Sequence, residues 1–85
     1  MQEGMEFKLS KHTQDMMVER KILEEWVRLT INNPDYEKVG MDNNTHYFKS
    51  IPEHEGHILH VVMNLHVLPK KVVTVFFDRR ARRKK

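Results

Sequence analysis

The chain has 85 residues, no cysteine and a formal net charge of +3. This length allows one small domain, which buries little apolar surface, so a partner protein or a homodimer would add stability. The lack of cysteine excludes disulfides and thiolate metal sites. No apolar run reaches the roughly 18 residues of a membrane helix, and no signal-peptide pattern opens the chain. We therefore expect a soluble, cytoplasmic protein without membrane contact.

The positive charge is concentrated at the C-terminal end. Six of the 15 Lys and Arg residues fall in the last seven positions, at Arg79, Arg80, Arg82, Arg83, Lys84 and Lys85. Residues 1–78 are therefore net acidic. The basic tail, residues 79–85, is either a nucleic-acid-binding arm that neutralises phosphates or a solvated end. We predict disorder beyond about Arg80, because consecutive like charges repel and bury no apolar surface.

The first part of the chain predicts one strand and two helices. Residues 5–9 alternate apolar and charged side chains, as a short half-buried strand does. Ser10 suits a helix N-cap and predicts a helix over residues 11–19 with a shallow attachment to the core. A second helix is predicted over residues 23–32, and Pro34 prevents its continuation. Its apolar stripe follows from spacings of three and four residues: Leu23, Trp26, Val27, Thr30 and Ile31.

The second part of the chain changes to a period of two. It predicts four strands, at residues 36–41, 45–51, 57–66 and 72–77, joined by short connections that favour antiparallel neighbours. The predicted order is β-α-α-β-β-β-β. We expect an α+β domain over residues 1–78, with two helices packed on one face of a four-stranded antiparallel sheet.

Alternation assigns side chains to the two faces of this sheet. In residues 57–66 the helix-facing set is Leu59, Val61, Met63 and Leu65. The opposite, open face receives His60, Asn64 and His66, and we expect Thr74, Tyr47 and Lys49 to join them there. In residues 72–77 one face receives Val73, Val75 and Phe77, and the other receives Val72, Thr74 and Phe76. Because both faces are apolar, this last strand is predicted to lie inside the sheet.

Several short motifs resemble a known family. Phe7-x-Leu9-Ser10-x-His12, Glu19-Arg20-x-Ile22 and Asn33-Pro34-Asp35 resemble the opening of a family of small bacterial and phage proteins catalogued as a domain of unknown function (family number 4258). Tyr47-Phe48-Lys49 and Val72-Val73-Thr74-Val75-Phe76-Phe77 resemble its later strands. The resemblance covers about residues 5–78. Such proteins look similar to toxins of RelE and BrnT type and to the barnase-like ribonuclease fold group.

The resemblance implies a toxin-like, metal-independent endoribonuclease or a degenerate relative, with RNA as substrate and a cognate antitoxin as partner. The net acidic body leaves two alternatives open. One is a non-enzymatic phage or bacterial adaptor or inhibitor that binds a host protein. The other is a nucleic-acid-binding accessory module that depends on the basic tail.

Metal-independent RNA cleavage needs a base, an acid and positive charge near the phosphate, and histidine can be either acid or base. The family comparison makes His12 prominent. We expect His12 to transfer the proton and Arg20, two helical turns later, to bind the phosphate. His60, Lys49 and Thr74 are candidate supporting groups on the open face. The structural alternatives are a hydrogen bond from His12 to a strand, an ion pair of Arg20 with a carboxylate, and a simple wet sheet face.

His54 and His57 are three residues apart in a hairpin connection. This spacing suggests metal ligands, but a zinc site needs three or four ligands. We expect a surface loop here, and no metal or cofactor in the protein. The dispersed methionines and Trp26 are expected to fill the core.

Overall fold

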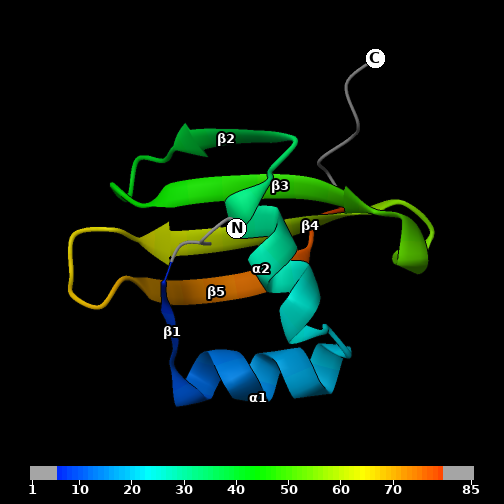
Figure 1. The fold of residues 1–85 in the computed structure, drawn as a ribbon, viewed down its shortest axis with the longest axis horizontal. Helices are drawn as coiled ribbons and strands as arrows, with labels where there is room; N and C mark the ends of the chain where they lie inside the picture. The colour runs from blue at the N-terminus through cyan, green and yellow to red at the C-terminus, as the bar shows by residue number, and fades with distance from the viewer. Residues whose placement is uncertain (1–5, 80–85) are drawn as a thin grey trace, which may run out of the picture.

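The computed structural model describes residues 6–79 and forms an α+β domain (Figure 1). The strands are β1 (Lys8–Leu9), β2 (Tyr36–Val39), β3 (Thr45–Ile51), β4 (His57–Asn64) and β5 (Lys71–Phe77). The helices are α1 (Lys11–Arg20) and α2 (Glu24–Asn32), with a 3-10 turn at Pro52–His54. This order confirms the predicted class and both helices. The predicted disorder of the tail concerns residues outside the described range.

The sheet has five strands in the order β1-β5-β4-β3-β2. Strands β2 to β5 form the predicted antiparallel meander. Strand β1 adds a parallel edge, with Lys8 opposite Lys71 and Leu9 opposite Val72. The predicted four-stranded, purely antiparallel sheet is therefore wrong and is corrected to a five-stranded mixed sheet. Strand β1 pairs with β5 through only two residue pairs, and so short a strand has too little periodic pattern for the sequence to indicate its partner.

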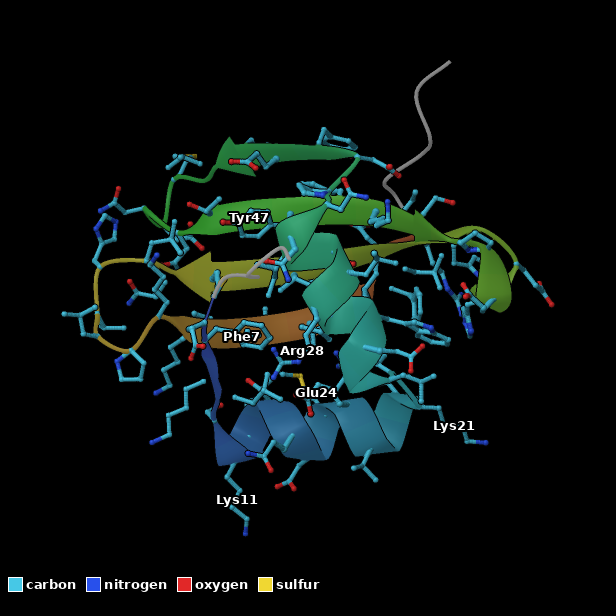
Figure 2. All side chains as sticks on the ribbon, in the orientation of Figure 1. Phe7, Lys11, Lys21, Glu24, Arg28 and Tyr47 are labelled. Carbon is cyan, nitrogen blue, oxygen red and sulfur yellow. The ribbon has the colours of Figure 1, made fainter. Side chains whose placement is uncertain are left out.

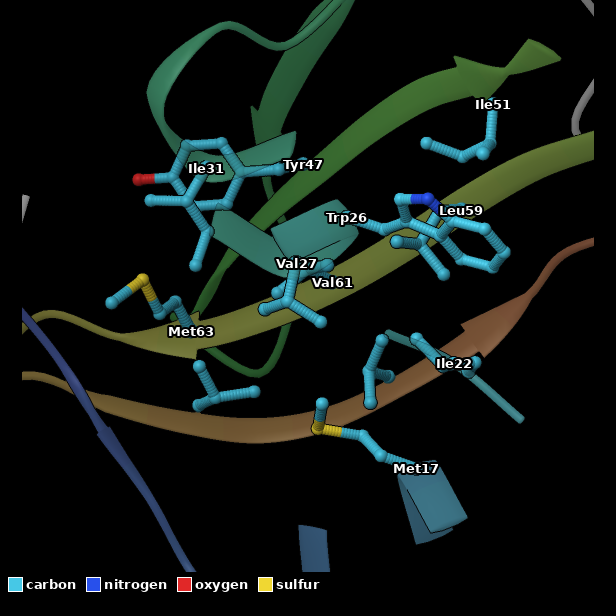
Figure 3. Packing of buried hydrophobic residues seen from close by; sticks show 12 residues of the cluster. Met17, Ile22, Trp26, Val27, Ile31, Tyr47, Ile51, Leu59, Val61 and Met63 are labelled. Carbon is cyan, nitrogen blue, oxygen red and sulfur yellow. The ribbon is translucent and has the colours of Figure 1, made fainter. Parts of the chain in front are cut away.

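Helix α2 contributes more apolar side chains to the core than α1 does. Its buried side chains are Trp26, Val27, Thr30 and Ile31, which confirms most of the predicted stripe; Leu23 is instead its exposed N-cap. Figure 3 shows three of these residues against side chains from β3 and β4: Tyr47, Ile51, Leu59, Val61 and Met63. Because α2 lies across this face, the opposite face of the sheet is the one left open by the helices (Figure 1).

Helix α1 begins as predicted, since the Ser10 hydroxyl accepts a hydrogen bond from the Thr13 amide at 3.1 Å. The helix does not lie flat on the sheet, however. It runs along the edge of β5, where Thr13 Oγ1 donates to the Val72 carbonyl at 3.1 Å and Arg20 Nη1 donates to the Val75 carbonyl at 3.1 Å. The expectation that both helices cover one face is therefore corrected. Polar side chains thus attach α1 to backbone carbonyls of β5, because β1 pairs with only the first two residues of β5 on that side.

Strand β5 contains a bulge. Val61 lies opposite Val75 and Val62 opposite Thr74, but Met63 lies opposite Val72, so Val73 is an extra residue. Val72 and Val75 are consequently both fully buried in the core, whereas Val73 is 39% exposed. The predicted alternation was wrong at Val72 and Val73, because a bulge moves a side chain to the other face of the sheet. The interior position of β5 is confirmed.

Three strands are shorter than predicted within the described residues. Strand β1 begins at Lys8, β2 ends at Val39 and β4 ends at Asn64, which leaves His66 outside the sheet. None of the helices within residues 6–79 is long and apolar enough to cross a membrane.

Candidate functional site

The structure separates two of the predicted catalytic residues from the others. His12 is exposed in the first turn of α1, and its side chain makes no hydrogen bond or ion pair within residues 6–79. Lys49 lies opposite Leu59 on the helix-facing side of the sheet, with its Nζ 3.6 Å from Asp35 Oδ1. Tyr47 shares that side and is buried in the core. The expected placement of Lys49 and Tyr47 on the open face was therefore wrong by one position of the alternation.

His66 is also outside the expected open-face cluster. It follows the end of β4, and its Nε2 donates to the Asn43 carbonyl in the β2–β3 turn at 3.1 Å. His60 and Thr74 do share the open face, because Val62 lies opposite Thr74 and His60 lies opposite Phe76. Of the five predicted catalytic residues, Arg20, Thr74 and His60 thus belong to one region around β5.

A cleft of about 560 Å³ lies at the end of β5. We call it the β5 cleft. Two arginines, two histidines, one carboxylate and two phenylalanines dominate its lining, which consists of Arg20, His54, His57, Thr74, Phe76, Phe77, Asp78 and Arg79. The hydrogen bond of Arg20 to the Val75 carbonyl holds its guanidinium at this edge. A guanidinium has five N–H donors, so one bond to the backbone leaves others for an anion.

The two histidines of the β5 cleft come from the β3–β4 connection. Pro52 starts its 3-10 turn, and Glu55 and Gly56 leave it with positive φ angles of 57° and 74°. His57 Nδ1 donates to the His54 carbonyl at 2.8 Å. A neutral His57 therefore carries its lone pair on Nε2. The His54 ring stacks on Phe77 at 4.1 Å between centroids and lies 5.1 Å from the His57 ring.

A second set of polar groups lies on the open face and leads to the same cleft. Four side chains form a hydrogen-bonded chain, which we call the Asp–His–His–Asp chain: Asp42, His46, His60 and Asp78. Its contacts are Asp42 Oδ1 to His46 Nε2 at 3.2 Å, His46 Nδ1 to His60 Nε2 at 2.8 Å, and His60 Nδ1 to Asp78 Oδ2 at 3.0 Å. His46 and His60 are diagonal neighbours, because His60 lies opposite Phe48 and His46 opposite Val62.

His60 and Asp42, two members of the Asp–His–His–Asp chain, lie in different environments. His60 is only 9% exposed, and burial lowers its pKa, although the hydrogen bond to Asp78 acts in the opposite direction. The charges of His46 and Lys38 add to the lowering. Asp42 is exposed in the β2–β3 turn, and the pKa of its carboxyl is lowered by the Asn44 amide and by His46. The chain therefore runs from solvent at Asp42 to a sheltered imidazole at His60.

An aromatic row shelters His60. The rings of Tyr36 and Phe48 stack at 4.5 Å, Phe48 lies 4.2 Å from the His60 ring, and Phe76 lies 4.7 Å on its other side. These residues occupy successive strands on the open face. Sequence reasoning missed His46, His57 and Asp78. The signal that could have found His46 is the alternation along the two neighbouring strands, which assigns His46 and His60 to the same face of the sheet.

Within the described part of the chain, no three His, Asp or Glu side chains converge as metal ligands would. His54 and His57 lie in a surface connection, as predicted for this loop.

Comparison with known proteins gives one match. No curated protein and no solved structure matches the chain. A family model matches residues 9–77, which include both helices, strands β2 to β5 and most of the β5 cleft. The chain therefore belongs to the family described as domain of unknown function DUF4258.

Proposed function

We propose that the protein is a metal-independent endoribonuclease and that the β5 cleft is its active site. The observation that carries this proposal is the gathering of Arg20, Arg79, His54 and His57 around one cleft. Arginine suits the phosphate, because its N–H groups match phosphate oxygens in pairs. Histidine suits proton transfer at neutral pH. These are the two requirements for cleaving RNA with its own 2′-hydroxyl as nucleophile.

In the proposed reaction, His57 Nε2 takes the proton of the 2′-hydroxyl. The 2′-oxygen forms a bond to phosphorus, the bond from phosphorus to the 5′-oxygen breaks, and an acid in the cleft returns one proton to that oxygen. The products are a 2′,3′-cyclic phosphate and a 5′-hydroxyl end. Arg20 and Arg79 offset the negative charge that grows on the phosphate oxygens.

Single-stranded RNA fits the surroundings of the cleft. Phe76 and Phe77 line it and offer apolar surface to an unstacked base, as aromatic side chains do in many single-strand sites. Arg79 lines the same cleft and is the first residue of the basic tail, which holds six Lys and Arg in seven positions. The other five Lys and Arg residues of the tail add positive charge that attracts a polyanion.

The order of elements also supports the likeness to RelE-type and BrnT-type toxins drawn from the sequence motifs. We include that likeness in the proposal: a toxin of this kind would act on cytoplasmic RNA and be restrained by an antitoxin. The proposed active site at the β5 cleft differs from the site predicted from the sequence, because His57 replaces His12 as the proton acceptor.

The test is cleavage of a single-stranded RNA oligonucleotide by the purified chain in the presence of EDTA. We expect His57→Gln to reduce cleavage by about 100- to 10,000-fold, the usual contribution of a general base. His12→Gln is the matched control, because His12 is exposed and has no partner within residues 6–79. Thermal unfolding of both variants would test whether the fold is unchanged. Cleavage that survives His57→Gln, or that His12→Gln removes, would refute the assignment.

A second candidate function, binding of a partner protein, is favoured by a groove between α1, α2 and β1. The groove has a volume of about 720 Å³, and its apolar lining includes Phe7, Met17, Val18, Ile22 and Leu23. Val18 is 79% exposed. Figure 2 shows Phe7 beside Arg28, whose guanidinium carbon lies 5.0 Å from the ring centroid, and Lys21 projecting from the end of α1.

Lys8 and Lys21 also line this groove, and its Glu24 is paired with Arg28, so the net charge of the lining is positive and complementary to an acidic amphipathic helix. We propose such a helix from an antitoxin as its occupant. The test is co-expression with the product of the neighbouring reading frame. A nuclease-resistant complex should dissociate with Val18→Glu and persist with Val39→Glu, because Val39 is a comparably exposed valine on β2. Equal behaviour of the two variants would exclude the groove.

A further inference from the structure

The Asp–His–His–Asp chain has a fixed proton count. Asp42 and Asp78 each accept a hydrogen bond when ionised, so His46 Nε2 and His60 Nδ1 must carry protons. The nitrogens left over, His46 Nδ1 and His60 Nε2, face each other at 2.8 Å. If both rings were neutral, two lone pairs would meet at this distance. A third proton between the rings removes the conflict, which makes the pair one imidazole and one imidazolium.

The surroundings indicate where this third proton rests. Burial lowers the pKa of His60, and the positive charge of Lys38 acts in the same direction. His46 lies nearer the solvent, beside the ionised Asp42. Because burial disfavours a second proton on His60, the arrangement that satisfies all three contacts has His46 donating to Asp42 and to His60, and His60 donating to Asp78.

We propose that His46 and His60 share this single proton and that the Asp–His–His–Asp chain relays it to the β5 cleft, where Asp78 delivers it as the acid of the cleavage reaction. The inference rests on the proposed function and names the acid which that reaction needs. Asp78 connects the two sites, because it accepts from His60 and also lines the β5 cleft.

The relay conserves protons at each step. The shared proton moves from His46 Nδ1 to His60 Nε2, and the proton on His60 Nδ1 moves to Asp78. Asp78 then releases a proton to the 5′-oxygen, and the chain changes from a net charge of −1 to −2. After the product leaves, water in the β5 cleft returns one proton through Asp78 to His60 Nδ1, and the proton on His60 Nε2 moves back to His46 Nδ1, which restores the chain. His46 and His60 act through Asp78 and are positioning residues.

Gly40 provides a second, steric indication that the contact at the outer end is built into the fold. A Cβ atom on residue 40 would lie 2.5 Å from His46 Nε2 and 2.8 Å from Asp42 Oδ1. Any larger residue would therefore displace the ring or the carboxylate. The lack of a side chain at this position lets Asp42 and His46 meet.

The first experiment measures the shared proton without reference to activity. Long-range ¹H–¹⁵N NMR spectra of the full chain, recorded from pH 5 to pH 8.5, report the protonation of each imidazole nitrogen. We expect His46 Nδ1 and His60 Nε2 to show nitrogen shifts between those of a protonated and an unprotonated nitrogen at pH 8. Two fully neutral rings at pH 8 would overturn the proposal.

The second experiment measures the relay. His46→Gln keeps an amide donor toward His60 but removes the titratable proton. It should slow cleavage of an RNA dinucleotide about 100-fold with little change in KM. The same variant should cleave a 3′-(4-nitrophenyl) phosphate ester of uridine at the wild-type rate, because a nitrophenolate leaving group needs no acid. His66→Gln is the matched control and should leave both rates unchanged.

The outcomes separate the two claims. Equal slowing of both substrates by His46→Gln indicates a structural role and overturns the relay. If the wild-type chain cleaves neither substrate, the proposed function and the delivery step both fail, whereas the NMR spectra still decide whether the two rings share a proton.

Discussion

The shared proton predicts an unusual pH dependence of stability. In the unfolded chain His46 and His60 titrate independently near pH 6.5. In the folded chain we expect the pair to hold one proton over a wide range. Below pH 6.5 the unfolded chain binds more protons than the folded chain. Burial lowers the pKa of His60, so the folded pair does not bind a second proton there. Above pH 6.5 the shared proton that we propose would make the folded pair bind more protons than the unfolded chain. Stability therefore falls on both sides of pH 6.5.

The size of the effect follows from the proton count. The folded pair holds one proton, whereas the unfolded chain has two independent histidines. Integrating the difference in bound protons over pH gives a loss of unfolding free energy of roughly 0.7 kcal/mol at one pH unit from the maximum. At two pH units the loss is roughly 1.9 kcal/mol by the same linkage relation. The curve is symmetric about pH 6.5, because both unfolded histidines have the same reference pKa.

The assay is urea unfolding of the wild-type chain and of a His46→Gln, His60→Gln double variant at pH values from 4.5 to 8.5. Subtracting the two free energies of unfolding at each pH isolates the pair, since the other titratable groups are common to both chains. We expect a difference curve with a maximum near pH 6.5. A difference that rises steadily through pH 6.5 would mean that both rings are simply buried as neutral groups, and it would refute the shared proton.

Three further predictions test the fold around the site. Thr13→Val should lower the unfolding free energy by about 1–3 kcal/mol, because the Val72 carbonyl loses a buried donor, and thermal unfolding against Thr13→Ser measures it. Gly40→Ala should abolish the maximum near pH 6.5 without removing a titratable group, since its Cβ displaces the His46 ring; a retained maximum in urea unfolding would contradict this. Burial raises the pKa of Tyr47, so stability should fall as pH rises above 10, and Tyr47→Phe should remove that loss in the same assay.

Local patterns were sufficient to predict the helices and the antiparallel meander. The stripe on α2 and the N-cap at Ser10 depend on neighbours within one or two turns, so the sequence determines them directly. The two-residue β1 ladder and the bulge at Val73 depend instead on contacts between residues more than 60 positions apart, or on one extra residue in a register. Neither leaves a periodic signal.

The candidate site was predictable only in part. Arg20 and Thr74 were expected near catalysis, and both line the β5 cleft. His57 was assigned to a surface loop, because nothing local indicates that its connection folds back beside the end of β5. The contact of His46 with His60 needs the β3–β4 register and also a choice of side-chain rotamers. Alternation alone predicts the face of each ring but not the hydrogen bond between them.

The central claim is that the β5 cleft binds RNA through its phosphate. The most direct measurement is an NMR titration of the full chain with uridine 3′-phosphate, which offers no bond to cleave, beside uridine without the phosphate. We predict shift changes at Arg20, Thr74, His57 and Arg79 that require the phosphate. Changes confined to the groove around Val18, or equal changes with and without the phosphate, would contradict the account.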